Sequence, residues 1–83
     1  MTTITVTRDD WTATYSGGPY IDLYVDGVNI DGINVFDYAT GKVSIPVTAA
    51  AVGAALDEWI VENEGDLDKH REYANGLAHM HRR

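Results

Sequence analysis

The side chains with the most chemical potential are four aspartates spaced four to six residues apart: Asp22, Asp26, Asp31 and Asp37. Paired carboxylates can act as general acid and base. Carboxylates also bind calcium, but the loop pattern D-x-[DN]-x-[DN]-G is missing. Asp26 and Asp31 each precede a glycine, which is typical of turns. We therefore expect no catalytic residue and no calcium site here.

The three histidines give an equally weak signal for metal chemistry. His79 and His81 could share one face of an extended segment, but no cysteine or acidic ligand stands beside them. The two serines lack the G-x-S-x-G setting of a nucleophile. Gly17-Gly18 has no following lysine and no helix that could hold phosphate. The sequence predicts a protein that is not an enzyme, with no metal and no cofactor.

Charge is distributed unevenly along the chain. The net charge is −7, with twelve acidic and two basic side chains in residues 1–68, and one acidic and four basic side chains in residues 69–83. Phosphate binding requires clustered Lys and Arg, so we expect no direct nucleic-acid binding. An acidic body favours basic protein partners. There is no cysteine, no basic-then-apolar leader and no apolar run long enough for a bilayer, so we expect a cytoplasmic protein that contacts no membrane.

A pentapeptide, apolar-Asp-Gly-apolar-Asn, occurs twice in succession over residues 25–34. Side chains alternate faces on a strand, yet the apolar residues here recur after three positions. Each Asp-Gly must therefore absorb one residue, either as a hairpin turn or as a bulge. We favour Asp26-Gly27 as the turn and Asp31-Gly32 as the bulge, and the reverse assignment stays open.

The surrounding residues predict the other strands. Thr-rich alternation over residues 3–8 and 11–15 indicates a hairpin about Asp9-Asp10, which pairs Arg8 with Trp11. Further strands are expected near residues 20–25, 28–35 and 43–45. The fold class is α+β: an antiparallel meander of four to five strands, one amphipathic helix packed on one face, and a weaker C-terminal helical segment.

Helical signals fill the second half of the chain. Thr48 is expected to cap a helix over residues 48–64, with one apolar stripe. The stripe contains Val52, Leu56, Trp59 and Ile60. A second helix is expected from Leu67 to about Ala74, ended by Asn75-Gly76. We interpret residues 1–83 as one small domain, with residues 76–83 as a basic tail that could be disordered.

Alternation along the strands sorts their side chains into two faces. The face under the helix should hold Ile4, Val6, Ile21, Leu23, Val28, Ile30, Ile33 and Val35. The opposite face should hold Tyr20, Asp22, Tyr24, Asn29, Asn34, Phe36 and Tyr38. Four aromatic side chains away from the helix indicate a surface for a partner or for self-association. Two alternatives stay open: Leu67, Tyr73 and Leu77 cover this face, or Phe36 and Tyr38 turn inward.

The plan of the whole chain resembles the small acidic accessory proteins of bacteriophages, of the anti-CRISPR or host-takeover type. The segments that carry the resemblance are residues 33–41, INVFDYATG, residues 45–48, IPVT, and the amphipathic helix. The resemblance implies a protein that binds and blocks a larger host macromolecule. It transfers no site residue.

Together these observations predict a non-enzymatic protein-binding module, a phage-type inhibitor or adaptor that acts on a host protein. Its contact surface would be the aromatic and acidic sheet face. The predicted partner-binding residues are Tyr20, Asp22, Tyr24, Phe36 and Tyr38. The alternatives are an acidic inhibitor that mimics nucleic acid, and a homo-oligomeric structural protein, of which a homodimer is the simplest form.

Overall fold

The computed structural model describes residues 3–80, and for residues 77–80 only the backbone. Its strands are β1 (Ile4–Arg8), β2 (Trp11–Tyr15), β3 (Tyr20–Val25), β4 (Val28–Asn34), β5 (Phe36–Asp37) and β6 (Lys42–Val43). Its helices are α1 (Ala49–Glu62), a short 3-10 turn over Glu64–Asp66, and α2 (Leu67–Met80). The α+β class is confirmed.

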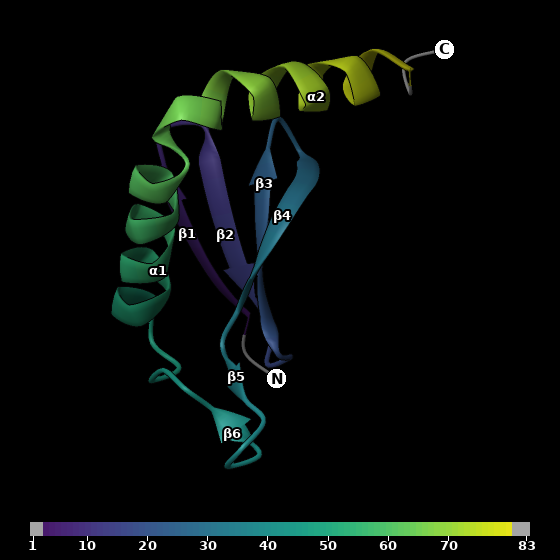
Figure 1. Cartoon of the computed structure of the whole chain (residues 1–83). Coiled ribbons are helices and arrows are strands. Elements are labelled where there is room, and N and C mark those ends of the chain that lie inside the picture. The colour runs from purple at the N-terminus through teal and green to yellow at the C-terminus, as the bar shows by residue number, and fades with distance from the viewer. Residues whose placement is uncertain (1–2, 81–83) are drawn as a thin grey trace.

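The main sheet is an antiparallel meander in the order β1-β2-β3-β4. The β1–β2 hairpin has the predicted register, with Arg8 opposite Trp11 and Ile4 opposite Tyr15. Figure 1 shows α1 running along one side of this sheet, while α2 crosses the end where the β1–β2 and β3–β4 turns lie. The small β5–β6 sheet lies at the other end.

The two Asp-Gly pairs have different backbone roles, as predicted. Asp26 and Gly27 both have positive φ (53° and 76°), as the central residues of a type I′ turn require. The register of β3 and β4 then shifts, because Tyr24 pairs with Asn29 and Leu23 pairs with Asp31. The unpaired residue of the bulge is therefore Ile30, just before Asp31-Gly32, and Gly32 itself has no positive φ.

The core lies between the sheet and the two helices, and its centre is β2 and β3. Its buried members are Trp11, Ala13, Tyr15, Ile21, Leu23, Val25, Val35, Val52, Leu56, Trp59 and Ala74. Ile4, Val6, Val28, Ile30 and Ile33, predicted to be covered, pack against this core but are only half-buried. The fully buried side chains of β2, Trp11, Ala13 and Tyr15, were not among the residues predicted for the covered face.

The packing of α1 on the sheet follows the predicted stripe. The Thr48 hydroxyl accepts a hydrogen bond from Ala51 N at 3.1 Å, so the predicted N-cap is confirmed. Val52, Leu56 and Trp59 are buried and Ile60 is half-buried. A Cβ at Gly53 would lie 2.8 Å from an Arg8 guanidinium nitrogen, so this glycine lets the helix approach β1 closely.

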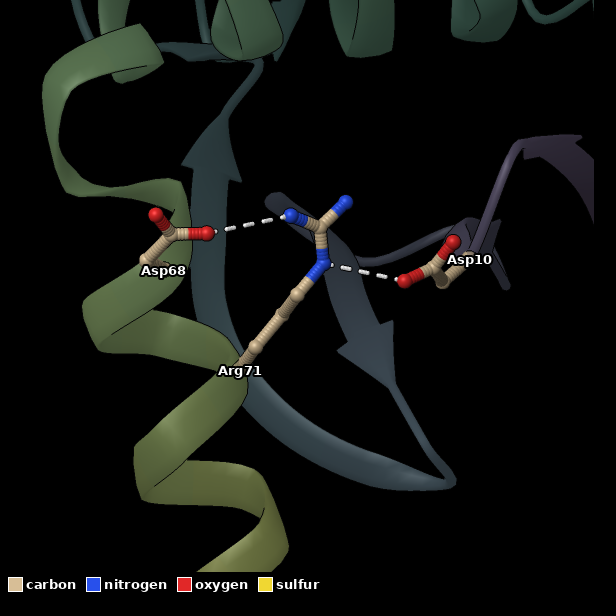
Figure 2. Close-up of polar contacts among 3 residues, drawn as sticks. All are labelled: Asp10, Asp68 and Arg71. Atoms are coloured by element: carbon tan, nitrogen blue, oxygen red, sulfur yellow. Dashed lines mark hydrogen bonds and ion pairs between the residues drawn. The ribbon is translucent and has the colours of Figure 1, made fainter.

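The second helix is longer than predicted. It continues through Asn75-Gly76 to Met80, so the prediction that this pair ends it is wrong. Burial of Ala74 and the contacts of Arg71 with Asp10 and Trp11 hold the helix against the core. The Arg71 guanidinium donates to Asp10 at 2.9 Å and, within α2, to Asp68 at 3.5 Å (Figure 2). It also lies 4.9 Å from the centre of the Trp11 ring. Tertiary packing therefore outweighs the weak helix propensity of Asn and Gly.

The last predicted strand, residues 43–45, also differs from the structure. The observed strand β6 begins at Lys42 and pairs with β5, not with the main sheet. Residues 76–80, expected to be a tail, belong to α2, and residues 81–83 lie outside the described part. Among residues 3–80, no helix combines the length and the apolar character needed to cross a bilayer.

Candidate binding surfaces

One face of the four-stranded sheet has no helix over it among the described residues (Figure 1). We call it the open face. The register places Thr5 opposite Thr14, Thr7 opposite Thr12, and Tyr24 opposite Asn29. Its strand residues are Thr5, Thr7, Thr12, Thr14, Tyr20, Asp22, Tyr24, Asn29, Gly32 and Asn34. Asp22 is the one charged side chain among them, so the face is almost neutral although the chain is strongly acidic.

Three of the five predicted contact residues lie together on the open face. Tyr20, Asp22 and Tyr24 alternate along β3, where Tyr20 is 47% exposed and Tyr24 is half-buried. A Cβ at Gly32 would lie 3.7 Å from the Tyr20 ring, so this ring lies against the glycine of the neighbouring strand.

The other two predicted residues lie on the β5–β6 hairpin, Phe36 in β5 and Tyr38 in the turn after it, so their assignment to the same sheet face is corrected. Phe36 and Tyr38 form an edge-to-face pair with ring centres 4.9 Å apart. They line a mainly apolar hollow of about 270 Å³ against Gly17, Gly18 and Pro19. The chain leaves the main sheet after Asn34, whose side chain accepts a hydrogen bond from Phe36 N at 2.8 Å.

The sequence left two alternatives open for the aromatic face: that the C-terminal segment covers it, or that Phe36 and Tyr38 turn inward. Neither holds for the described side chains. Leu67 packs against the core, and Tyr73 is 59% exposed. The side chain of Leu77 lies outside the described residues. Phe36 is half-buried and Tyr38 is 71% exposed, so neither has joined the core.

A second surface, between α1 and β4, was missed from the sequence. A helix is about 10 Å wide and strands lie about 4.8 Å apart, so one helix covers roughly two strands. α1 contacts β1 and β2, which leaves a groove of about 420 Å³ beside β4. The groove is lined by Gly32, Ile33, Asn34, Val35, Ser44, Ile45, Ala55, Glu58, Trp59 and Glu62. The sequence predicts one amphipathic helix for four to five strands, and this mismatch could have revealed that part of the sheet is left uncovered.

Asp31 does not line this groove itself, but it holds Trp59, which does. Because the bulge at Ile30 shifts the alternation, Asp31 pairs with the buried Leu23 and lies on the helix side of the sheet. One carboxylate oxygen accepts from the Trp59 indole N–H at 2.9 Å, and the other accepts from Gly32 N at 2.8 Å. The carboxylate therefore fixes the ring that forms the inner end of the groove.

The remaining candidates for chemistry have structural roles or lie outside the described part. The Asp37 carboxylate accepts from Ala39 N at 2.9 Å in the β5–β6 turn, and the His70 ring lies 5.3 Å from that of Trp59. The side chains of His79 and His81 are outside the described residues. Over the part of the chain that is described, no group of three or more His, Asp or Glu could hold a metal ion.

Comparison with protein-family models, with curated proteins and with solved structures finds no match to this chain.

Proposed function

We propose that this chain is a non-enzymatic protein-binding module that docks its open face on a larger protein. It would act as an inhibitor or adaptor in the cytoplasm of a host cell, as its resemblance to phage accessory proteins implies. The observation that carries the proposal is the open face itself: a nearly neutral sheet surface with exposed Tyr20 and half-buried Tyr24, in a chain of net charge −7.

The composition of the open face suits a protein partner. Tyrosine supplies a large contact area together with a hydroxyl that can form hydrogen bonds, and it is enriched at interface centres. The threonine rows of β1 and β2 add hydroxyl groups on a β-branched, stiff scaffold. The stiffness of these threonine side chains limits the freedom that would be lost on binding.

Charge favours a different protein over a second copy of the chain. Two copies in face-to-face contact would bring two net charges of −7 within about one Debye length of each other. A basic or neutral partner meets no such repulsion. Phe36 and Tyr38 lie on the separate β5–β6 hairpin, and we include them as the edge of the contact area.

The test is affinity capture from a host lysate, followed by measurement of the affinity for the captured protein. Tyr20→Ala combined with Tyr24→Ala should weaken binding about tenfold or more, because buried aromatic anchors dominate interface energies. Tyr73→Ala is the matched control, since this tyrosine is exposed on α2 and is not a residue of the open face. A folded double variant that binds the captured protein as tightly as the wild type would sink the proposal. Loss of binding only on neutralising carboxylates would favour a nucleic-acid mimic instead.

A further inference from the structure

The groove between α1 and β4 has a continuous apolar floor. Ile33, Val35 and Ile45 come from the β4 side and the segment after β6, and Ala55 and Trp59 come from α1. Its volume of about 420 Å³ lies in the range of sites that bind ligands. Ile33 belongs to the part of the core-side sheet face that α1 leaves uncovered.

One wall of the groove is the outer edge of β4, which has no neighbouring strand among residues 3–80. Val35 N donates to Pro19 O at 2.9 Å, and hydrogen bonds alternate along an antiparallel pair. The backbone groups of Gly32 and Asn34 therefore point away from β3. The Gly32 N–H is taken by the Asp31 carboxylate, which leaves the Gly32 carbonyl and both backbone groups of Asn34 facing outward.

The opposite wall is acidic. Glu58 and Glu62 stand one helical turn apart on α1, and both side chains are exposed at the groove. Like charges at this spacing repel each other. The ion pairs among the described residues involve Arg8, Lys69 and Arg71, and none of them includes either glutamate. The groove thus presents two carboxylates that no described basic side chain neutralises.

We infer that this groove binds an extended basic segment of a partner protein, which adds to β4 as a fifth strand. Its backbone would pair with Gly32 and Asn34. Every second side chain of an added strand faces the groove. A Lys or Arg at two such positions would lay its aliphatic stem on the apolar floor and bring its charge to Glu58 and Glu62. This surface shares Gly32 and Asn34 with the open face, but its apolar floor and acidic wall lie on the helix side of the sheet, so the inference does not rest on the proposed function.

The test uses a display library of random nonapeptides selected on the intact, immobilised chain. Enriched peptides should carry Lys or Arg at alternate positions, and their affinity should fall as salt is raised. The double variant Glu58→Gln, Glu62→Gln should weaken their binding about fivefold to twentyfold. The control is Glu64→Gln with Glu72→Gln, which removes the same charge from exposed positions outside the groove.

A second pair of variants tests the shape of the groove. Ala55→Leu should fill it and block the peptides, whereas Ala54→Leu adds the same side chain at an exposed neighbour that does not line the groove. On peptide binding, the amide resonances of residues 32–35 should shift most. The inference is overturned if no basic peptide is enriched, or if the enriched peptides bind the groove variants and the wild type equally. Peptides lost only with Tyr20→Ala and Tyr24→Ala would belong to the open face.

Discussion

At the scale of single residues, Asp31 shows how one carboxylate connects two elements. Its two oxygens accept from Gly32 N on its own strand and from the Trp59 indole on α1. Trp59 in turn contacts Trp11, with ring centres 5.5 Å apart. Asp31, which the sequence analysis explained as a turn residue, therefore orients Trp59, an aromatic residue of the core.

We predict that Asp31→Ala lowers the free energy of unfolding by about 1–3 kcal/mol, because it leaves a buried indole N–H without an acceptor. Trp59→Phe removes the donor, and the two variants combined form a double-mutant cycle that isolates this bond. Urea denaturation measures each variant. Asp22→Ala is the control, since this exposed aspartate lies on the open face. A coupling energy of zero between residues 31 and 59 would contradict the assigned role.

The sequence could not show on which face of the sheet Asp31 lies, because that face depends on which residue of β4 is left unpaired. One unpaired residue at Ile30 moves every later side chain of β4 to the other face. The repeat predicted that a bulge exists near this point, but not which residue is unpaired. The placement of Tyr20, Asp22 and Tyr24 could be predicted, because β3 carries no such irregularity on its own strand.

At the scale of elements, the two Asp-Gly pairs provide an internal comparison. Gly27 has φ of 76°, in the left-handed region that L-residues avoid, whereas Gly32 does not. We predict that Gly27→Ala lowers the free energy of unfolding by about 1–2 kcal/mol. Gly32→Ala should change it by less than about 0.5 kcal/mol, because the new Cβ would make only ordinary contacts at 3.7 Å and beyond. Thermal and urea unfolding of both variants checks this.

Equal losses at both glycines would contradict this assignment of turn and bulge. The comparison is well matched, since each variant adds one methyl group to the same hairpin and keeps the aspartate before it. A larger loss at Gly32 than at Gly27 would instead favour the reverse assignment, in which Asp31-Gly32 forms the turn.

The elements that local signals specify were predicted well, and those that depend on distant contacts were not. The β1–β2 register and the Thr48 cap follow from nearby residues. The length of α2 depends on contacts across the fold, namely burial of Ala74 and the reach of Arg71 to Asp10. In α2 these tertiary contacts outweigh local propensity. The β5–β6 hairpin is different: its contacts, such as that of Asp37 with Ala39, are local, and it lies where a continuing strand was expected.

At the scale of the whole molecule, α1 packs on one side of the sheet and α2 crosses its end, which leaves the other side open (Figure 1). The result is two candidate surfaces with different chemistry. The open face is nearly neutral and presents hydroxyl groups, while the groove beside β4 is apolar with an acidic wall. Their variants do not overlap, so binding at one surface can be removed while the other is kept.

This separation leads to a prediction about self-association, which an open sheet face and an open edge strand would otherwise favour. The net charge of −7 opposes contact between two copies, so sedimentation equilibrium should give the monomer mass from micromolar to millimolar concentration at low salt. Raising the salt screens this repulsion, so high salt is the more demanding test of the predicted monomer. A dimer that dissociates on Tyr24→Ala would assign the open face to a second copy of the chain. A dimer that dissociates only on Ala55→Leu would place that second copy in the groove, where its own strand, and not a basic segment of another protein, would extend β4.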